Sequence, residues 1–194
     1  MHLGYGKVGT MTAVLQKILI HIYVQSLVEL ICVAVLLGLI FSSLWHRFGG
    51  QRWWRPICGL LLGIWTGVVL WVTVFSRQRG SDSQIQWIPF ITYWRVLTGE
   101  STELLRSAFM NALLFFPGGL AYAGLMIRGS QSSRTVIAVP LLFGLFSLGI
   151  ELTQSTLRLG TLEIDDVLHN ILGAAAGFAV FWVDANKQKN NCLI

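Results

Sequence analysis

The sequence predicts an all-α protein, an integral membrane helical bundle of about five transmembrane helices with an amphipathic N-terminal lead-in helix. Apolar side chains make up 54% of the 194 residues, whereas charged side chains make up only 12%. Soluble domains of this length rarely reach such a composition. The chain also holds several apolar runs of the roughly 17–25 residues that a helix needs to cross a bilayer. Only short polar connections separate these runs, so they leave no room for a separate soluble domain.

The segment 1–23 is predicted to be amphipathic. Apolar side chains recur every three or four residues from Val14 to Ile22, opposite polar ones. We therefore expect this segment to lie on the membrane surface or to lead into the first span. Residues 24–184 then form the transmembrane domain, and residues 185–194 form a cytoplasmic tail.

Five apolar runs are predicted to cross the membrane. Their approximate bounds are residues 24–44, 56–75, 107–127, 135–152 and 167–183. The second run carries Gly59, Gly63 and Gly67, and glycines at four-residue intervals let another helix approach closely. The third contains Pro-Gly-Gly at 117–119, which we expect to kink or locally open the helix. The aromatic residues of the connection 76–106 should hold part of it at the membrane interface.

Basic residues predict how the chain is oriented. They are concentrated in two short connections and the C-terminal tail, as Arg47, Arg52, Arg55, Arg128, Arg134, Lys187 and Lys189. The connections on the other side are longer and mix basic with acidic residues. Short segments rich in Lys and Arg face the cytoplasm. We therefore expect an external N-terminus and a cytoplasmic C-terminus.

Several function classes find no support in the sequence. The net charge of +5 does not indicate a nucleic-acid partner, because the basic residues flank apolar runs, where they set topology or contact anionic lipid. Phosphate-loop, dinucleotide, nucleophile-elbow and zinc-protease motifs are absent. Asp166 and His169 are potential metal ligands, but no second His or Cys completes a zinc set. The sequence therefore predicts neither a cofactor nor a metal site.

Polar side chains gather at the predicted outer ends of the last three spans. They are Arg106 and Asn111 in the third span, Glu151 and Gln154 in the fourth, Arg158 in the following loop, and Asp166, His169 and Asn170 in the fifth. Taken singly, they are ordinary helix caps and ion pairs. Together they predict a ligand-binding cavity open to the outer side, with Glu151 and Asp166 as candidate catalytic groups, because polar groups in apolar helices are costly. Glu29 either faces the same cavity or pairs inside the bundle.

Four motifs follow one another in an order that resembles the VanZ-like family of bacterial membrane proteins. They are Ile88-Pro89-Phe90, the run from Asn111 to Gly119, Glu151-x-x-Gln154 with Arg158, and Asp166-x-x-x-Asn170-x-x-Gly173. The resemblance implies a bacterial inner-membrane protein whose motif residues face the cell envelope. The founding member of that family is associated with resistance to the glycopeptide antibiotic teicoplanin. Two positions depart from the pattern, since Gln86 replaces an expected Asn and His169 is not part of it.

Three functions remain open at this point, as does the oligomeric state. The first is a protein that engages a membrane lipid, a lipid-linked cell-wall precursor or a lipoglycopeptide antibiotic at the outer leaflet, contributing to teicoplanin-type resistance or envelope homeostasis. The second is an envelope enzyme acting on a lipid-linked, phosphate-containing substrate, with Glu151 or Asp166 as acid–base group and Arg106 and Arg158 facing the phosphate. The third is a small transporter gated at 117–119. The resemblance favours the first.

The orientation can be tested with single cysteines in a background that lacks the three native ones. Arg52→Cys should react with a membrane-impermeant thiol reagent only after the cells are opened, because arginine-rich short connections stay in the cytoplasm. Arg128 is predicted to lie on the same side and Asp165 on the outer side. Labelling of Arg52→Cys from outside intact cells would contradict this topology.

Overall fold

The computed structural model describes residues 32–78, 80, 85–99, 103–126 and 133–191, without the side chains of 133–135, 184 and 186–191. The predicted lead-in segment 1–23 lies outside these residues. So do Glu29, Arg128 and the start of the first predicted span.

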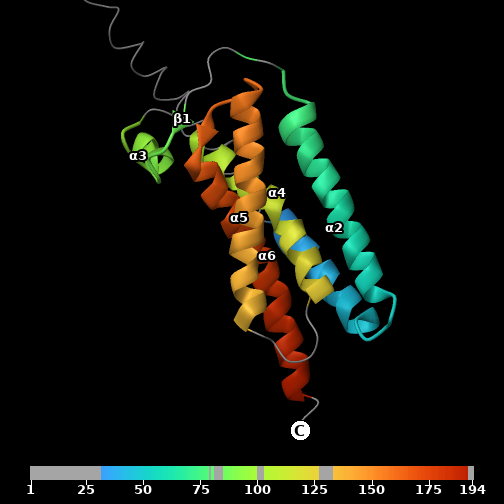
Figure 1. The fold of residues 1–194 in the computed structure, drawn as a ribbon. Helices are drawn as coiled ribbons and strands as arrows, with labels where there is room; N and C mark the ends of the chain where they lie inside the picture. The colour runs from blue at the N-terminus through green and yellow to red at the C-terminus, as the bar shows by residue number, and fades with distance from the viewer. Residues whose placement is uncertain (1–31, 79, 81–84, 100–102, 127–132, 192–194) are drawn as a thin grey trace, which may run out of the picture.

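Helices make up most of the described chain (Figure 1). In order they are the helix Cys32–Phe48, α2 (Trp54–Leu70) with its π-helical continuation η1 (Trp71–Phe75), α3 (Ile91–Leu97), α4 (Glu103–Met126), α5 (Ser133–Thr156) and α6 (Ile164–Asn191). The strands β1 (Ile85–Gln86) and β2 (Leu162–Glu163) form one short parallel pair. The predicted all-α membrane bundle is confirmed.

Four helical stretches among the described residues are long and apolar enough to cross a membrane. They are Trp54–Phe75, Glu103–Met126, Val136–Thr156 and Ile164–Val183. These correspond to the second to fifth predicted spans. Cys32–Phe48 is a shorter apolar helix that overlaps the described part of the first predicted span. Helix α6 continues beyond its apolar part through most of the predicted tail.

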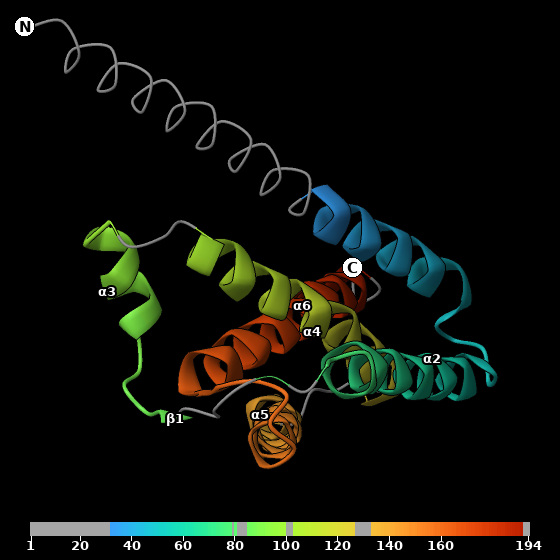
Figure 2. The same ribbon diagram turned by 90° about the horizontal axis from the view of Figure 1, so that it is seen from above.

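Helices α4 and α6 form the centre of the bundle and run side by side in the same direction (Figures 1 and 2). Gly173 of α6 meets the backbone of Ala112, and Gly177 meets the backbone of Phe116. Gly119 of α4 meets the α6 backbone in the same way. A methyl group at any of these glycines would overlap a carbonyl oxygen of the facing helix. Contact between backbones at small residues is a main source of helix association in membranes, where lipid is as apolar as the side chains.

The glycine stripe of α2, formed by Gly59, Gly63 and Gly67, does not contact α6. Gly63 and Gly67 are exposed, and no described atom lies within 4 Å of the position a side chain would take. Within the described part of the chain, no helix therefore approaches the stripe at these two positions. Helix α2 packs on α4 through a different face, which buries the large rings of Trp54 and Trp65.

Helix α4 passes through Pro117 without interruption, so the expected local opening at 117–119 is also wrong. Pro117 lacks an N–H, which leaves the carbonyl of Leu113 without its usual helical donor. The indole N–H of Trp65 donates to the next carbonyl, that of Leu114, over 2.8 Å. Gly118 makes room for this contact, since a Cβ there would lie 2.6 Å from the Trp65 ring. The Pro-Gly-Gly segment is thus a packing site for α2.

Helix Cys32–Phe48 is fastened by aromatic side chains near its C-terminal end. Phe41 and Trp45 each contact Trp54 of α2 and Phe181 of α6, with ring centroids between 4.9 and 5.7 Å apart. Tilted and edge-to-face pairs of this kind add stability beyond the area that they bury. Three helices therefore meet at this aromatic cluster.

Gly173→Leu should lower the melting temperature of the purified protein in detergent, because the side chain would force α4 and α6 apart. Overfilling a packed contact costs about 1–3 kcal/mol, and backbone contact places this position at the upper end or beyond. Gly67→Leu on the exposed face of α2 is the matched control and should change little. A melting temperature for Gly173→Leu equal to that of the control would contradict the contact.

Candidate functional site

Four membrane-spanning helices bring their polar ends together at one end of the bundle. Helices α2 and α5 finish there, and α4 and α6 begin there, close to the β1–β2 pair and α3 (Figure 1). The first and last turns of a helix carry backbone groups without helical partners. Within hydrocarbon each of these groups needs a partner from the protein. This end of the bundle is therefore where polar side chains are required.

Asp165 holds the segment before and within α3. The side chain is only 1% exposed, and its carboxylate accepts hydrogen bonds from the backbone N–H groups of Phe90, at 2.5 Å, and Thr92, at 3.0 Å. It therefore supplies the cap that α3 does not provide itself. Phe90 has a left-handed φ of 64°, an unfavourable conformation for an aromatic residue. The contact with Asp165 stabilises that conformation.

The short strands position the same segment. Ile85 lies opposite Leu162, and Gln86 lies opposite Glu163, in a parallel pair. The pairing ties the chain before α3 to the connection between α5 and α6. As a result the Ile-Pro-Phe motif at 88–90 lies beside the start of α6, although more than seventy residues separate the two in sequence.

Glu151 and Gln154 fasten the end of α5. Both side chains are buried, at 4% and 3% exposed. The Glu151 carboxylate accepts a hydrogen bond from the backbone N–H of Glu163 at 3.1 Å, and the Gln154 amide donates to the carbonyl of Thr73 at 2.7 Å. Thr73 lies in η1, where the end of the helix leaves carbonyl groups without partners. These contacts join α5 to β2 and to the end of α2.

Asp166 lines a cavity of about 210 Å³ at this end of the bundle. The Asn111 side chain hydrogen-bonds to its carboxylate. The rest of the wall is formed by Arg77, Thr92, Leu104, Ser107, Ala108, Gln154, Thr161 and Glu163. One arginine therefore faces two carboxylates, and Glu151 is near enough to Asp166 for their charges to interact. The cavity is acidic on balance and rich in hydrogen-bond acceptors.

Burial raises the pKa of the Glu163 carboxyl above its ordinary value. Among its neighbours, Arg95 and Arg77 lower this pKa and Asp165 raises it, so burial decides the direction. A carboxyl group of this kind takes up a proton more readily than an exposed one. When protonated it donates a hydrogen bond, and when ionised it only accepts. Glu163 can therefore adapt to either kind of partner in the cavity.

His169 and Asn170 lie outside the cavity wall. Tyr93 Oη is 2.9 Å from His169 Nε2, and the Asn170 amide donates to Ser147 Oγ at 2.8 Å. His169 thus connects α6 to α3, and Asn170 connects α6 to α5. The Nδ1 atom of His169 and the Oδ1 atom of Asn170 have no hydrogen-bond partner in the described part of the chain.

Arg106 and Arg158 are exposed and do not line the cavity. Arg158 has a left-handed φ of 57° in the turn after α5, and its carbonyl accepts a hydrogen bond from Gly80 at 3.0 Å. It therefore shapes the turn. The arginine in the wall is Arg77, which sequence reasoning missed. Its only signal was its place directly after the second apolar run.

The structure thus separates the predicted site residues into two groups. Gln154 and Asp166 line the cavity, and Asn111 and Glu151 act on Asp166 through a hydrogen bond and through charge. Outside the wall stand Arg106, Arg158, His169 and Asn170. Within the described ranges no group of three or more His, Cys, Asp or Glu side chains is placed to hold a metal ion.

Four long apolar helices with a polar cavity at one end define a multi-pass helical membrane protein. The sequence model of the VanZ/LLP1 family matches residues 59–184, which is more than half of the chain. The protein therefore belongs to the VanZ/LLP1 family, and the resemblance noted in its motifs is confirmed. The matched region begins within α2 and contains every residue of the cavity wall. Comparison with curated proteins and with solved structures gives no match.

Asp165→Ala should release the segment around α3, because it removes the acceptor for two backbone donors. Loss of a helix cap costs about 1 kcal/mol, and amides that lose a buried partner exchange faster. Hydrogen–deuterium exchange of peptides covering residues 85–98 should therefore accelerate. Asp165→Asn, which keeps one acceptor oxygen, should lie between the wild type and Asp165→Ala. Unchanged exchange in Asp165→Ala would rule out this role for the carboxylate.

Proposed function

We propose that this protein binds the polar headgroup of a molecule anchored in the outer leaflet of the bacterial inner membrane. The candidate ligands are a lipid-linked cell-wall precursor and a lipoglycopeptide antibiotic. The position of the cavity supports this proposal, because the ends of spanning helices lie at the depth of lipid headgroups. Membership of the VanZ/LLP1 family supports a contribution to teicoplanin-type resistance or to envelope homeostasis. The distribution of basic residues supports the outer side.

One observation carries the proposal. Asp166 and Glu163 both line the wall of the polar cavity, and that wall contains one arginine. Carboxylates and the Gln154 carbonyl accept hydrogen bonds, so they favour hydroxyl, amide N–H and ammonium groups. Within the cavity wall a phosphate would meet these two carboxylates and one cationic side chain, that of Arg77. Sugar and peptide groups of an envelope molecule fit this chemistry better than its phosphate does.

The cavity volume limits what can enter. About 210 Å³ is less than the roughly 300–1,000 Å³ of most small-molecule pockets. We expect one sugar or one amino-acid-sized group to enter, while the rest of the headgroup lies at the surface beside α3. The exposed rings of Trp87 and Trp94 are available to it there.

An enzyme of the cell envelope is the second candidate. It is favoured by the raised pKa of Glu163, which provides a potential proton donor beside Asp166 as base. Arg106 and Arg158 no longer support phosphate chemistry, because both lie outside the cavity wall. The transporter hypothesis loses its main feature, because α4 has no break at 117–119.

Native mass spectrometry of the purified protein with a lipid-linked cell-wall precursor tests the proposal, and a teicoplanin-type lipoglycopeptide is the second probe. Asp166→Asn should weaken binding about 10-fold or more, because a hydrogen bond to a charged group is worth about 1.5–3 kcal/mol. Arg158→Gln, outside the cavity, is the comparison variant and should bind like the wild type.

Equal affinity of Asp166→Asn and wild type for both probes would refute binding at the cavity. A catalytic role would appear differently in the same measurement. The wild type would convert the bound precursor to a product of different mass, and Glu163→Gln, which removes the proton donor from the cavity wall, would bind the precursor without converting it.

A further inference from the structure

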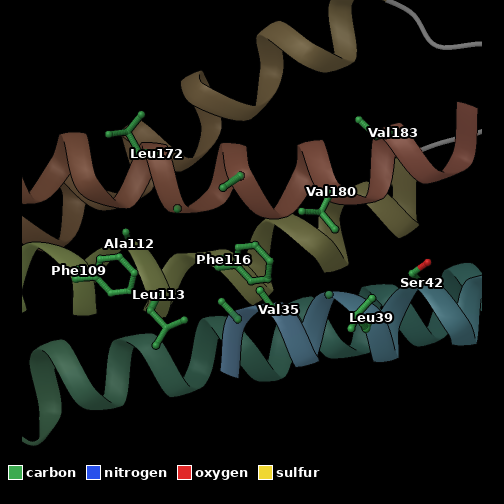
Figure 3. A pocket seen from close by; sticks show the side chains of 14 residues that line it. Val35, Leu39, Ser42, Phe109, Ala112, Leu113, Phe116, Leu172, Val180 and Val183 are labelled. Carbon is green, nitrogen blue, oxygen red and sulfur yellow. The ribbon is translucent and has the colours of Figure 1, made fainter. Parts of the chain in front are cut away.

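A second, apolar groove opens on the membrane face of the bundle between helix Cys32–Phe48, α4 and α6 (Figure 3). Its volume is about 620 Å³, and it shares no lining residue with the polar cavity. Aliphatic and aromatic side chains such as Val35, Phe116 and Val180 line it, and Ser42 is the one polar residue among them. Its volume is in the range of pockets that hold small molecules, about 300–1,000 Å³.

The groove exists because small residues from three helices lie along it. Ala34 and Gly38 contribute from helix Cys32–Phe48, Ala112 from α4, and Gly173 and Ala176 from α6. These positions offer no large side chain to fill the space between the helices. In a bilayer an apolar hollow open to the membrane is filled by hydrocarbon, because an empty one forfeits dispersion contacts.

The length of the groove selects the kind of occupant. On α6 its lining runs from Leu172 to Val183, which is about 16 Å at 1.5 Å per residue. That is close to half of the roughly 30 Å hydrocarbon core, the depth of one leaflet. Figure 3 shows Leu172 and Phe109 at one end and Ser42 and Val183 at the other. An acyl chain of a single leaflet matches this extent.

The positive charge near the Ser42 end of the groove favours a lipid with an anionic headgroup. The segment 45–58 follows Ser42 on the same helix and continues into α2. It contains Arg47, Arg52 and Arg55 and no acidic residue. The side chains of Arg47 and Arg52 are exposed. Basic side chains beside a membrane surface attract anionic lipid headgroups.

We propose that this groove binds one acyl chain of an anionic phospholipid, whose headgroup lies beside Ser42 and the arginines of segment 45–58. The lipid fills the hollow and holds helix Cys32–Phe48 against α4 and α6. The end of the groove at Ser42 and Val183 points away from the polar cavity, so the groove takes a lipid of the other leaflet. It is independent of the proposed headgroup function.

The test compares phosphatidylglycerol with phosphatidylcholine of identical acyl chains, added to the delipidated protein in detergent. Native mass spectrometry should detect one retained phosphatidylglycerol, and the melting temperature should rise more with it than with phosphatidylcholine. Ala176→Phe fills the groove from α6 and Val35→Trp fills it from the facing helix, so either should abolish the retained lipid. Gly63→Phe, on the exposed face of α2, is the matched control and should keep it. Melting of each variant without lipid checks that it is folded.

Equal retention of the two lipids by the wild type would overturn the proposal, and this comparison requires no variant. Retention of phosphatidylglycerol by folded Ala176→Phe and Val35→Trp would overturn it as well. A dimer that dissociates when the groove is filled would mean that a second copy of the chain occupies it instead. Arg47→Gln combined with Arg52→Gln should remove the preference for the anionic lipid while the groove stays open.

Discussion

The contact between the backbones of α4 and α6 is the constraint on which the rest of the structure depends. Gly173 and Gly177 let α6 rest directly on α4 carbonyl groups. Two helices that approach this closely have a fixed register, so the polar residues at their first turns are fixed relative to each other. The hydrogen bond between Asn111 and Asp166 follows from that register. The cavity at one end of the bundle and the apolar groove along the pair both use these two helices as walls.

Three of the buried polar side chains at these helix ends serve backbone groups of neighbouring elements. Asp165 accepts from the start of α3, Glu151 accepts from β2, and Gln154 donates to the end of η1. Each of these side chains is buried, and each contact gives a backbone group a partner within the protein. The carboxylates of Asp166 and Glu163 line the wall of the polar cavity instead. Side chains that stabilise the fold and side chains that line the cavity therefore lie within a few residues of each other at the same helix ends.

The two hollows differ in chemistry because they lie at different places in the bundle. The polar cavity lies where helices end and where charged side chains have to face each other. The apolar groove lies along continuous helices whose backbone groups are satisfied internally, so its lining needs no polar side chain. One fold thus offers a site for headgroup chemistry at one surface and a site for hydrocarbon toward the other.

The sequence by itself determined the class of fold, the family and the gathering of polar residues at helix ends. Hydropathy and run length depend only on the order of residues along the chain, and spanning a bilayer requires little else. It did not determine which residues meet, because that depends on the rotation and the neighbours of each helix. The glycines of α2 and α6 have the same spacing, yet among the described residues those of α6 contact the backbone of another helix and those of α2 do not. Arg77 and Arg158 are both polar residues beside an apolar run, yet only Arg77 lines the cavity. The spacing of glycines along a sequence shows that another helix can pack closely there. The tertiary packing decides which helix does so.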